Sequence, residues 1–252
     1  MQLHVRESGP SGAPVLLLIH GGGVGGWMWE AQVAHFGSRY RVLVPDLPGH
    51  DRSSGEPFTT SADIVAELAG RLQGLPTGTD ITVAGFSLGG QIAVELAATH
   101  PELISRAIVT SALTVGIPAP GLSLLLVGAA APLARRTWFA KAQARSLFVP
   151  PGLFDDYLRT ARALSKENLL AFTRANAEFR TPSAWPGFPG RVLLLAGANE
   201  PRALLRGMRR LRDDHPRGDL VIHGDAGHGL PLQYPDWFNG RVDEWIRSTP
   251  AH

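Results

Sequence analysis

Short runs of β-branched residues and leucine recur along the chain, and longer segments with helical spacing separate them. The runs occupy residues 15–19, 41–44, 80–84, 106–110, 191–196 and 219–222. Continuous apolar runs of this length are typical of strands that are buried on both faces of a sheet. Because strands and helices alternate, the sequence predicts an α/β fold with a mostly parallel central sheet flanked by helices. In such sheets, functional residues gather at the carboxyl ends of the strands.

One segment breaks the alternation, because residues 115–189 contain no convincing strand. Helical spacing appears there twice, in Tyr157, Ala161 and Leu164, and in Leu169, Phe172, Ala175 and Phe179. Prolines flank the segment, namely Pro118 and Pro120 at its start and Pro182, Pro186 and Pro189 at its end. Proline interrupts a continuing helix. We therefore expect a helical insertion, or cap, at 115–189 within a core formed by 1–114 and 190–252.

Composition excludes several classes of function. The 252 residues include no cysteine, so thiolate-bound metals, iron–sulfur clusters and cysteine nucleophiles are ruled out. The formal net charge is only +2, which does not favour nucleic acid as a partner. The first ten residues are polar, which is atypical of a signal peptide. The longest apolar stretch, 121–134, is interrupted by Gly128 and Pro132 and is too short to span a membrane.

These observations set the expected partners and location. We expect a cytoplasmic protein that acts on a small molecule and binds neither membrane nor nucleic acid. The stretch 121–134 is expected to be a buried or lid helix. No metal or organic cofactor is implied, and the sequence does not indicate an oligomeric state.

The most specific motif is Gly85-Phe86-Ser87-Leu88-Gly89, which lies directly after one predicted strand and before the helical run 91–100. A turn between a strand and a helix with glycines on both sides of a serine exposes that hydroxyl at the carboxyl edge of the sheet. The Leu88 N–H lies at the positive end of the helix, where it would face a developing oxyanion. We interpret Ser87 as a nucleophile, and the alternative is a plain glycine-rich turn.

A second glycine-rich loop, His20-Gly21-Gly22-Gly23, follows the predicted strand 15–19. Such a loop presents backbone N–H groups without side chains in the way, so Gly22 is the candidate for the second oxyanion donor. A phosphate-binding loop would also have glycines after a strand. No Gly-Lys-Ser/Thr ending follows, which argues against a nucleotide P-loop. We expect His20 to have a structural hydrogen-bonding role.

A histidine near the end of the chain completes the pattern. His228 lies on the loop after the last predicted strand, between Gly227 and Gly229, which allow it to reach back over the sheet edge. An imidazole has an ordinary pKa of about 6.5, which suits a general base that accepts the serine proton and returns it to a leaving group.

With these pieces in place, the chain resembles the α/β-hydrolase superfamily over nearly its whole length. The resemblance is carried by His20-Gly-Gly-Gly, by Asp46-Leu-Pro-Gly-His50 with Arg52-Ser53, by the Gly85 to Gly90 turn, and by Ala226-Gly-His228. It implies a serine nucleophile, an acid and a histidine in that chain order. It also implies a helical cap after the sixth strand, where the insertion 115–189 falls.

The acid departs from the family pattern, which usually has an aspartate on the loop after the seventh strand. That loop here reads Gly197-Ala-Asn-Glu200-Pro201, which makes Glu200 the candidate. Asp225 is the main rival, and Asn199 would leave only a neutral orienter. A second departure is Asp51, where relatives commonly have glycine. Asp tolerates left-handed backbone, so we expect a structural role, the alternative being a polar contact at the mouth of the site.

The remaining candidates concern the substrate. Trp27 and Phe86 are expected to line an acyl pocket. The sequence as a whole predicts a serine hydrolase that cleaves a small carboxylic ester, thioester or lactone through an acyl-enzyme. The alternatives are a lyase, a cofactor-free perhydrolase or a carbon–carbon bond hydrolase on the same scaffold, or a ligand-binding protein with a degenerate site.

Overall fold

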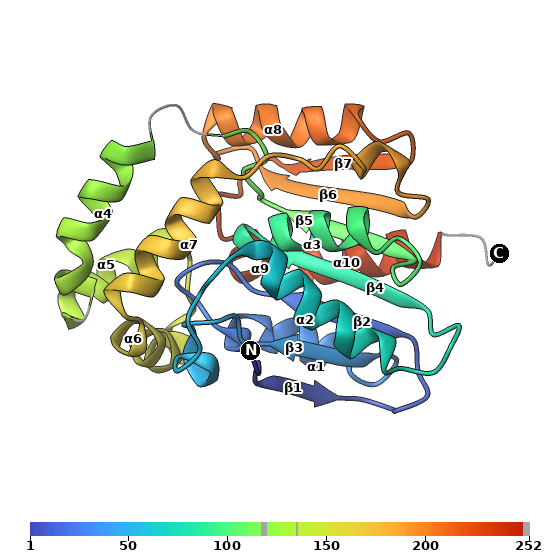
Figure 1. Cartoon of the computed structure of the whole chain (residues 1–252), viewed down its shortest axis with the longest axis horizontal. Coiled ribbons are helices and arrows are strands. Elements are labelled where there is room, and N and C mark those ends of the chain that lie inside the picture. Colours follow the sequence, from blue (N-terminus) through green and yellow to red (C-terminus); the bar gives the residue numbers. More distant parts are fainter. Residues whose placement is uncertain (117–119, 135, 249–252) are drawn as a thin grey trace.

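The computed structural model describes residues 1–116, 120–134 and 136–248 and is built around one sheet (Figure 1). Its strands follow the order β1-β3-β2-β4-β5-β6-β7, and all pair in parallel except β1 with β3. The strands are β1 Val5–Ser8, β2 Val15–Ile19, β3 Arg41–Pro45, β4 Ile81–Phe86, β5 Arg106–Thr110, β6 Arg191–Gly197 and β7 Gly218–His223. The predicted α/β fold with a mostly parallel sheet is confirmed, and each predicted run forms a strand.

The edge strand β1 was not predicted from the sequence. Its residues, Val-Arg-Glu-Ser, are only partly buried and contain no apolar run. It forms because its backbone pairs with β3, in the register Val5 to Pro45 and Ser8 to Val42. The described sheet has a single antiparallel strand before β2. Consequently the cap segment follows the fifth strand and the Glu200 loop the sixth, one fewer than the resemblance implied.

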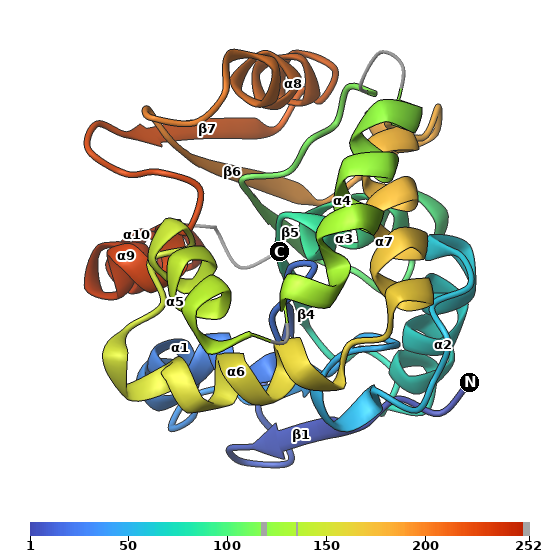
Figure 2. The ribbon, with the colours of Figure 1, turned by 90° about the vertical axis from the view of Figure 1, so that its left-hand side faces the viewer.

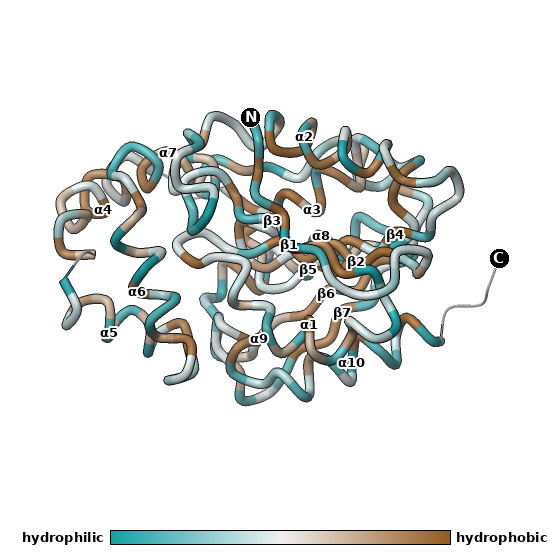
Figure 3. The backbone as a smooth tube through the Cα atoms, turned by 90° about the horizontal axis from the view of Figure 1, so that it is seen from below, coloured by the Kyte–Doolittle hydropathy of each residue, from teal (hydrophilic) through white to brown (hydrophobic). Residues whose placement is uncertain are grey.

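Helices cover both faces of the sheet, as Figures 1 and 3 show. One face is packed by α2, α3 and α8, and the opposite face by α1 and α10. These elements are η1 Gly26–Trp29, α1 Glu30–Phe36, η2 Asp51–Ser53, α2 Ser61–Gln73, α3 Leu88–Thr99, α8 Arg202–Asp213, α9 Leu230–Gln233 and α10 Pro235–Arg247. Side chains of β2 alternate between the two layers: Val15, Leu17 and Ile19 face one, and Leu16 and Leu18 the other. This burial on both faces explains the unbroken apolar run.

Between β5 and β6 the chain forms helices that gather at the carboxyl end of the sheet (Figure 2). They are α4 Pro120–Ala134, α5 Thr137–Ser146, η3 Pro151–Leu153, α6 Phe154–Ala163, α7 Lys166–Glu178 and η4 Trp185–Gly187. Leu125 and Leu126 of α4 are exposed, so α4 is not a buried helix. The last of these helices, η4, packs against α3. Pro118 lies outside the described residues, in which no helix is long and apolar enough to cross a bilayer.

Candidate active site

Ser87 occupies a tight turn between β4 and α3. Its backbone has φ 54° and ψ −115°, a conformation that residues other than glycine rarely adopt. The turn closes only around glycines, because a Cβ on Gly85 would lie 2.0 Å from the Gly89 carbonyl oxygen, and one on Gly89 2.2 Å from the Ile19 carbonyl oxygen. The contacts force the serine outward at the carboxyl edge of the sheet. Leu88 begins α3, so its N–H has no carbonyl one turn earlier in the helix to bond with.

His228 connects Ser87 to Glu200. The imidazole Nε2 lies 3.2 Å from Ser87 Oγ, and Nδ1 lies 3.0 Å from Glu200 Oε2. With the proton on Nδ1, the imidazole donates to the carboxylate and leaves Nε2 to accept the serine proton. Ser87 and His228 are 141 positions apart, so only the folded chain brings them together. The His228 side chain is 32% exposed, whereas that of Glu200 is fully buried. Substrate and water therefore reach the imidazole but not the carboxylate.

A polar cradle holds the Glu200 carboxylate. Its Oε1 accepts hydrogen bonds from Ser111 Oγ at 2.6 Å and from the Gly197 N–H at 2.9 Å. Ser111 follows β5 with a φ of 54° and is fully buried, and sequence reasoning missed it. The only hint was a serine next to the carboxyl end of a predicted strand. Because two donors hold Oε1, the other carboxylate oxygen, Oε2, faces His228. In this position the carboxylate accommodates the methylene that glutamate has in addition to those of aspartate.

The rival orienters lie elsewhere. Asp225 is exposed, and its backbone N–H and C=O bond to His223 and to the Asn199 side chain. Asn199 is likewise exposed and turned towards that carbonyl rather than towards His228. The arrangement of atoms thus favours Glu200 as the group that orients the imidazole.

Two buried histidines fix the loop that carries Gly22. His20 Nε2 accepts from the Leu47 N–H at 2.8 Å, and its Nδ1 donates to the Gly21 carbonyl. His50 Nε2 accepts from the Gly23 N–H at 3.0 Å, and its Nδ1 donates to the Pro48 carbonyl. A second proton on either imidazole would sit on Nε2 and break the hydrogen bond that this nitrogen accepts. This structural role was expected for His20, whereas His50 was recognised only as part of a motif.

Burial holds both imidazoles neutral. It lowers the pKa of His20 to about 4 against the opposing effect of its bond to Gly21. Burial, together with the neighbouring His20, lowers the pKa of His50 to about 3. The two rings are in edge contact, with centroids 5.1 Å apart. A charge on either buried ring would have neither a counterion nor water around it, so the loop requires the neutral form of both histidines.

The protein is expected to lose stability in mild acid. Between about pH 6.5 and pH 4, the unfolded chain binds protons at His20 and His50 that the folded chain excludes. Their stabilisation is complete above about pH 6.5, and each site removes about 1.4 kcal/mol of unfolding free energy per pH unit below it. Urea unfolding at a series of pH values measures this slope. His50→Asn should reduce the slope by about 1.4 kcal/mol per pH unit, and an unfolding free energy that is flat over this range would contradict the assignment.

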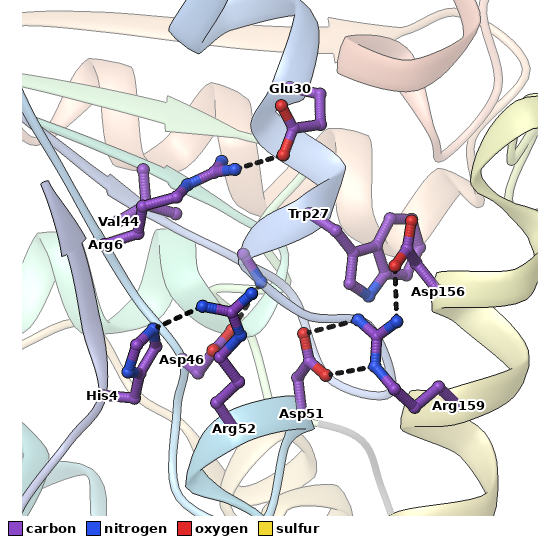
Figure 4. A pocket seen from close by; sticks show the side chains of 11 residues that line it. His4, Arg6, Trp27, Glu30, Val44, Asp46, Asp51, Arg52, Asp156 and Arg159 are labelled. Carbon is purple, nitrogen blue, oxygen red and sulfur yellow. Dashed lines mark hydrogen bonds and ion pairs between the residues drawn. The ribbon is translucent and has the colours of Figure 1, made fainter. Parts of the chain in front are cut away.

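Asp51 links η2 to α6, as Figure 4 shows. Its carboxylate receives two hydrogen bonds from Arg159 of α6, at 3.0 and 3.2 Å, and Arg159 also pairs with Asp156. Its φ is 39°, the left-handed backbone that aspartate tolerates. The expected left-handed backbone is thus observed, and the polar contact of Asp51 is its ion pair with Arg159, in a cleft whose described lining includes neither Ser87 nor His228. The surrounding cleft, of about 90 Å³, contains mainly charged side chains.

Trp27 and Phe86, the candidates for an acyl pocket, lie in different surroundings. Trp27 lines the charged cleft of Figure 4, and its Nε1 donates to Thr160 of α6 at 3.0 Å. Its ring also meets Tyr157 edge-on. The residue therefore packs the core against the cap segment. Phe86 is buried beside His228, with ring centroids 5.1 Å apart, and its ring packs against that imidazole.

Comparison with known proteins gives one family model and several similar proteins. A family model described as "Alpha/beta hydrolase family" matches residues 16–241. A pimeloyl-[acyl-carrier protein] methyl ester esterase from Aromatoleum aromaticum is 28% identical, covering 92% of this chain and 86% of its own. An (E)-2-((N-methylformamido)methylene)succinate hydrolase from Acinetobacter baylyi is 23% identical, covering 98% and 95%. The crystal structure of an enol-lactonase from Burkholderia xenovorans superimposes with a TM-score of 0.82 at 22% identity, covering 98% and 96%.

Proposed function

Because the chain belongs to the alpha/beta hydrolase family and is a hydrolytic enzyme, we propose that it cleaves a small carboxylic ester, thioester or lactone through a serine acyl-enzyme. The observation that carries the proposal is the continuous hydrogen-bonded path from Ser87 Oγ through His228 to the buried Glu200. Relatives named as an ester esterase and an enol-lactonase support the same reaction class. In this proposal, residues 115–189 form a cap over the core of 1–114 and 190–252.

The reaction begins when Ser87 Oγ attacks the carbonyl carbon and passes its proton to His228 Nε2. The Oγ–carbon bond forms, and the carbonyl oxygen becomes an oxyanion that the N–H groups of Gly22 and Leu88 stabilise. His228 then returns the proton to the leaving oxygen or sulfur, whose bond to the carbonyl carbon breaks. Water, deprotonated by His228, attacks the acyl-enzyme and restores Ser87. Glu200 holds the Nδ1 proton throughout and stabilises the imidazolium.

The hydrogen bonds around the glycine loop support Gly22 as an oxyanion donor. His50 already engages the Gly23 N–H, and His20 engages the Gly21 carbonyl. These bonds fix the neighbours on both sides of Gly22 and leave its own N–H for a substrate. A donor held in place before the reaction stabilises charge without reorganising during it.

A kinetic burst tests the proposed route. Mixed with short p-nitrophenyl esters, the enzyme should release p-nitrophenol in a burst stoichiometric with active sites, followed by slower turnover. A fluorophosphonate probe should label the protein and abolish that turnover. If a panel of esters, thioesters and lactones is left intact and the probe does not react, the hydrolase proposal is wrong and a ligand-binding role is favoured.

A further inference from the structure

A cavity of about 320 Å³ lies between the glycine loop and the helices α4 to α7. Its floor is formed by Gly22 and Gly23, beside the proposed oxyanion site. The wall from α4 consists of Val127, Ala130, Ala131 and Ala134, which follow at i, i+3, i+4 and i+7 and so share one face of the helix. Three of these four residues are alanines, which keeps the space open.

The lining carries no charge. Within the described part of the chain, no aspartate, glutamate, lysine, arginine or histidine side chain contributes to it. The one titratable group is the phenol of Tyr157, and burial raises its pKa to about 12, so it is neutral near pH 7.

The hydroxyl groups of the lining are already hydrogen-bonded. Tyr157 donates to the Gln143 side-chain oxygen at 3.3 Å, and Ser146 donates to the Gln143 carbonyl at 2.7 Å. Thr173 donates to the Leu169 carbonyl at 2.6 Å. These groups therefore have no proton to offer a carboxylate. An ionised group placed in the cavity would give up part of its hydration and gain no counterion.

The place of the cavity indicates which part of a substrate enters it. The leaving group must lie next to His228, since that imidazole returns a proton to it. His228 comes from the loop after β7, whereas Gly22 and Gly23 come from the loop after β2, across β4 in the strand order. The cavity begins at Gly22 and Gly23, and its wall at Leu147 lies close to Gly229, next to His228. Because its floor is the glycine loop, the acyl chain, and not the leaving group, is the part that we expect to point into it.

We propose, on the basis of the hydrolase function above, that this cavity binds the acyl chain of an uncharged, apolar ester or thioester of medium length. A methylene is similar in size to water, which takes about 30 Å³ in the liquid, so roughly ten such groups fill the space. A chain bearing a terminal carboxylate is disfavoured because the lining offers it no cation, and the amide NH₂ of Gln143 is an uncharged donor. Ala130 and Ala131 set the depth available to the chain.

Two substrate series test the acyl assignment. With p-nitrophenyl esters from acetate to octanoate, kcat/KM should rise about fourfold for each added methylene, which corresponds to about 0.8 kcal/mol, until the cavity is full. With acetate esters of alcohols of increasing length, the rise should be much smaller. A rise confined to the alcohol series would overturn the acyl assignment.

A charged substrate tests the absence of counterions. The mono-p-nitrophenyl ester of adipic acid has the same number of carbons as p-nitrophenyl hexanoate but ends in a carboxylate. Its kcat/KM should be lower than that of the hexanoate by about 100-fold or more. Equal rates for the two esters would contradict the proposal.

A pair of variants on α4 tests the location. Ala131→Phe fills the cavity and should lower the ratio of kcat/KM for octanoate to that for acetate by about tenfold or more. Ala129→Phe places the same side chain on the exposed face of the helix and should leave the ratio unchanged. Thermal unfolding of both variants verifies that they are folded. Equal ratios in the two variants would overturn the location.

The outcomes separate this inference from the function on which it rests. An enzyme that hydrolyses the acetate ester with a burst, yet shows no gain with acyl length, remains a hydrolase with a different acyl site. A protein that hydrolyses no ester and does not react with the fluorophosphonate probe overturns both proposals.

Discussion

Ser87→Ala is expected to lower kcat for every ester that the enzyme hydrolyses by about 10⁴- to 10⁶-fold. The substitution removes the oxygen that lies 3.2 Å from His228 Nε2 and that forms the acyl-enzyme bond. The backbone conformation with φ 54° is held by the tight contacts of Gly85 and Gly89, so alanine should occupy the same turn. Residual activity would come from the oxyanion donors and binding alone.

Steady-state kinetics together with intact-protein mass spectrometry measure this effect. The wild-type protein should gain the mass of one fluorophosphonate adduct, and Ser87→Ala should gain none. Ser248→Ala, at the C-terminal end of α10, serves as the matched control and should behave as the wild type does. Adduct formation or undiminished turnover in Ser87→Ala would refute the assignment of the nucleophile.

Glu200→Gln is expected to lower kcat by about 10³- to 10⁴-fold. The Gly197 N–H and the Ser111 hydroxyl require an acceptor at the position of Oε1, so the amide oxygen of glutamine should occupy it. The amide NH₂ would then face His228 Nδ1 and force that nitrogen to accept. With the proton moved to Nε2, the imidazole could no longer take the proton of Ser87.

The matched comparison is Asp225→Asn, which changes the rival carboxylate by the same chemistry. Asp225 is exposed and bonds through its backbone, so kcat should stay within about threefold of the wild type. A pH profile of kcat for both variants adds a readout that simple unfolding does not mimic. If Asp225→Asn is the more damaging change, the assignment of the acid is wrong.

Much of the site could be predicted from short stretches of the sequence. The turn around Ser87 is specified by five consecutive residues, whose glycines are required because a Cβ at Gly85 or Gly89 would lie less than 2.3 Å from a carbonyl oxygen. The runs that form β2 to β6 are equally local, since burial on both faces demands unbroken apolar residues, whereas β7 is a partly exposed edge strand. The edge strand β1 left no such trace, because it has no apolar run: it pairs with β3 through its backbone, only Val5 packs against the core, and Arg6 and Glu7 form ion pairs.

The contacts that join distant segments could not be predicted from short stretches of the sequence. Ser111 reaches Glu200 across 89 positions, and Trp27 reaches Thr160 across 133. A serine after a strand and a tryptophan after a glycine loop have many possible partners, and nothing in their neighbours along the chain selects one. Trp27 accordingly lines a charged cleft, while alanines of α4 line the cavity that we assign to the acyl chain.

The sequence by itself determined the order of strands and helices, the nucleophile turn and the candidates for base and acid, because each depends on residues within one turn or one strand. Only the tertiary structure brought Glu200, and not Asp225, to His228, gave His50 and Ser111 their hydrogen-bond partners, and gathered uncharged side chains around the cavity beside Gly22. Those features depend on which side chains meet across the carboxyl edge of the sheet, and such meetings are fixed by packing over the whole chain.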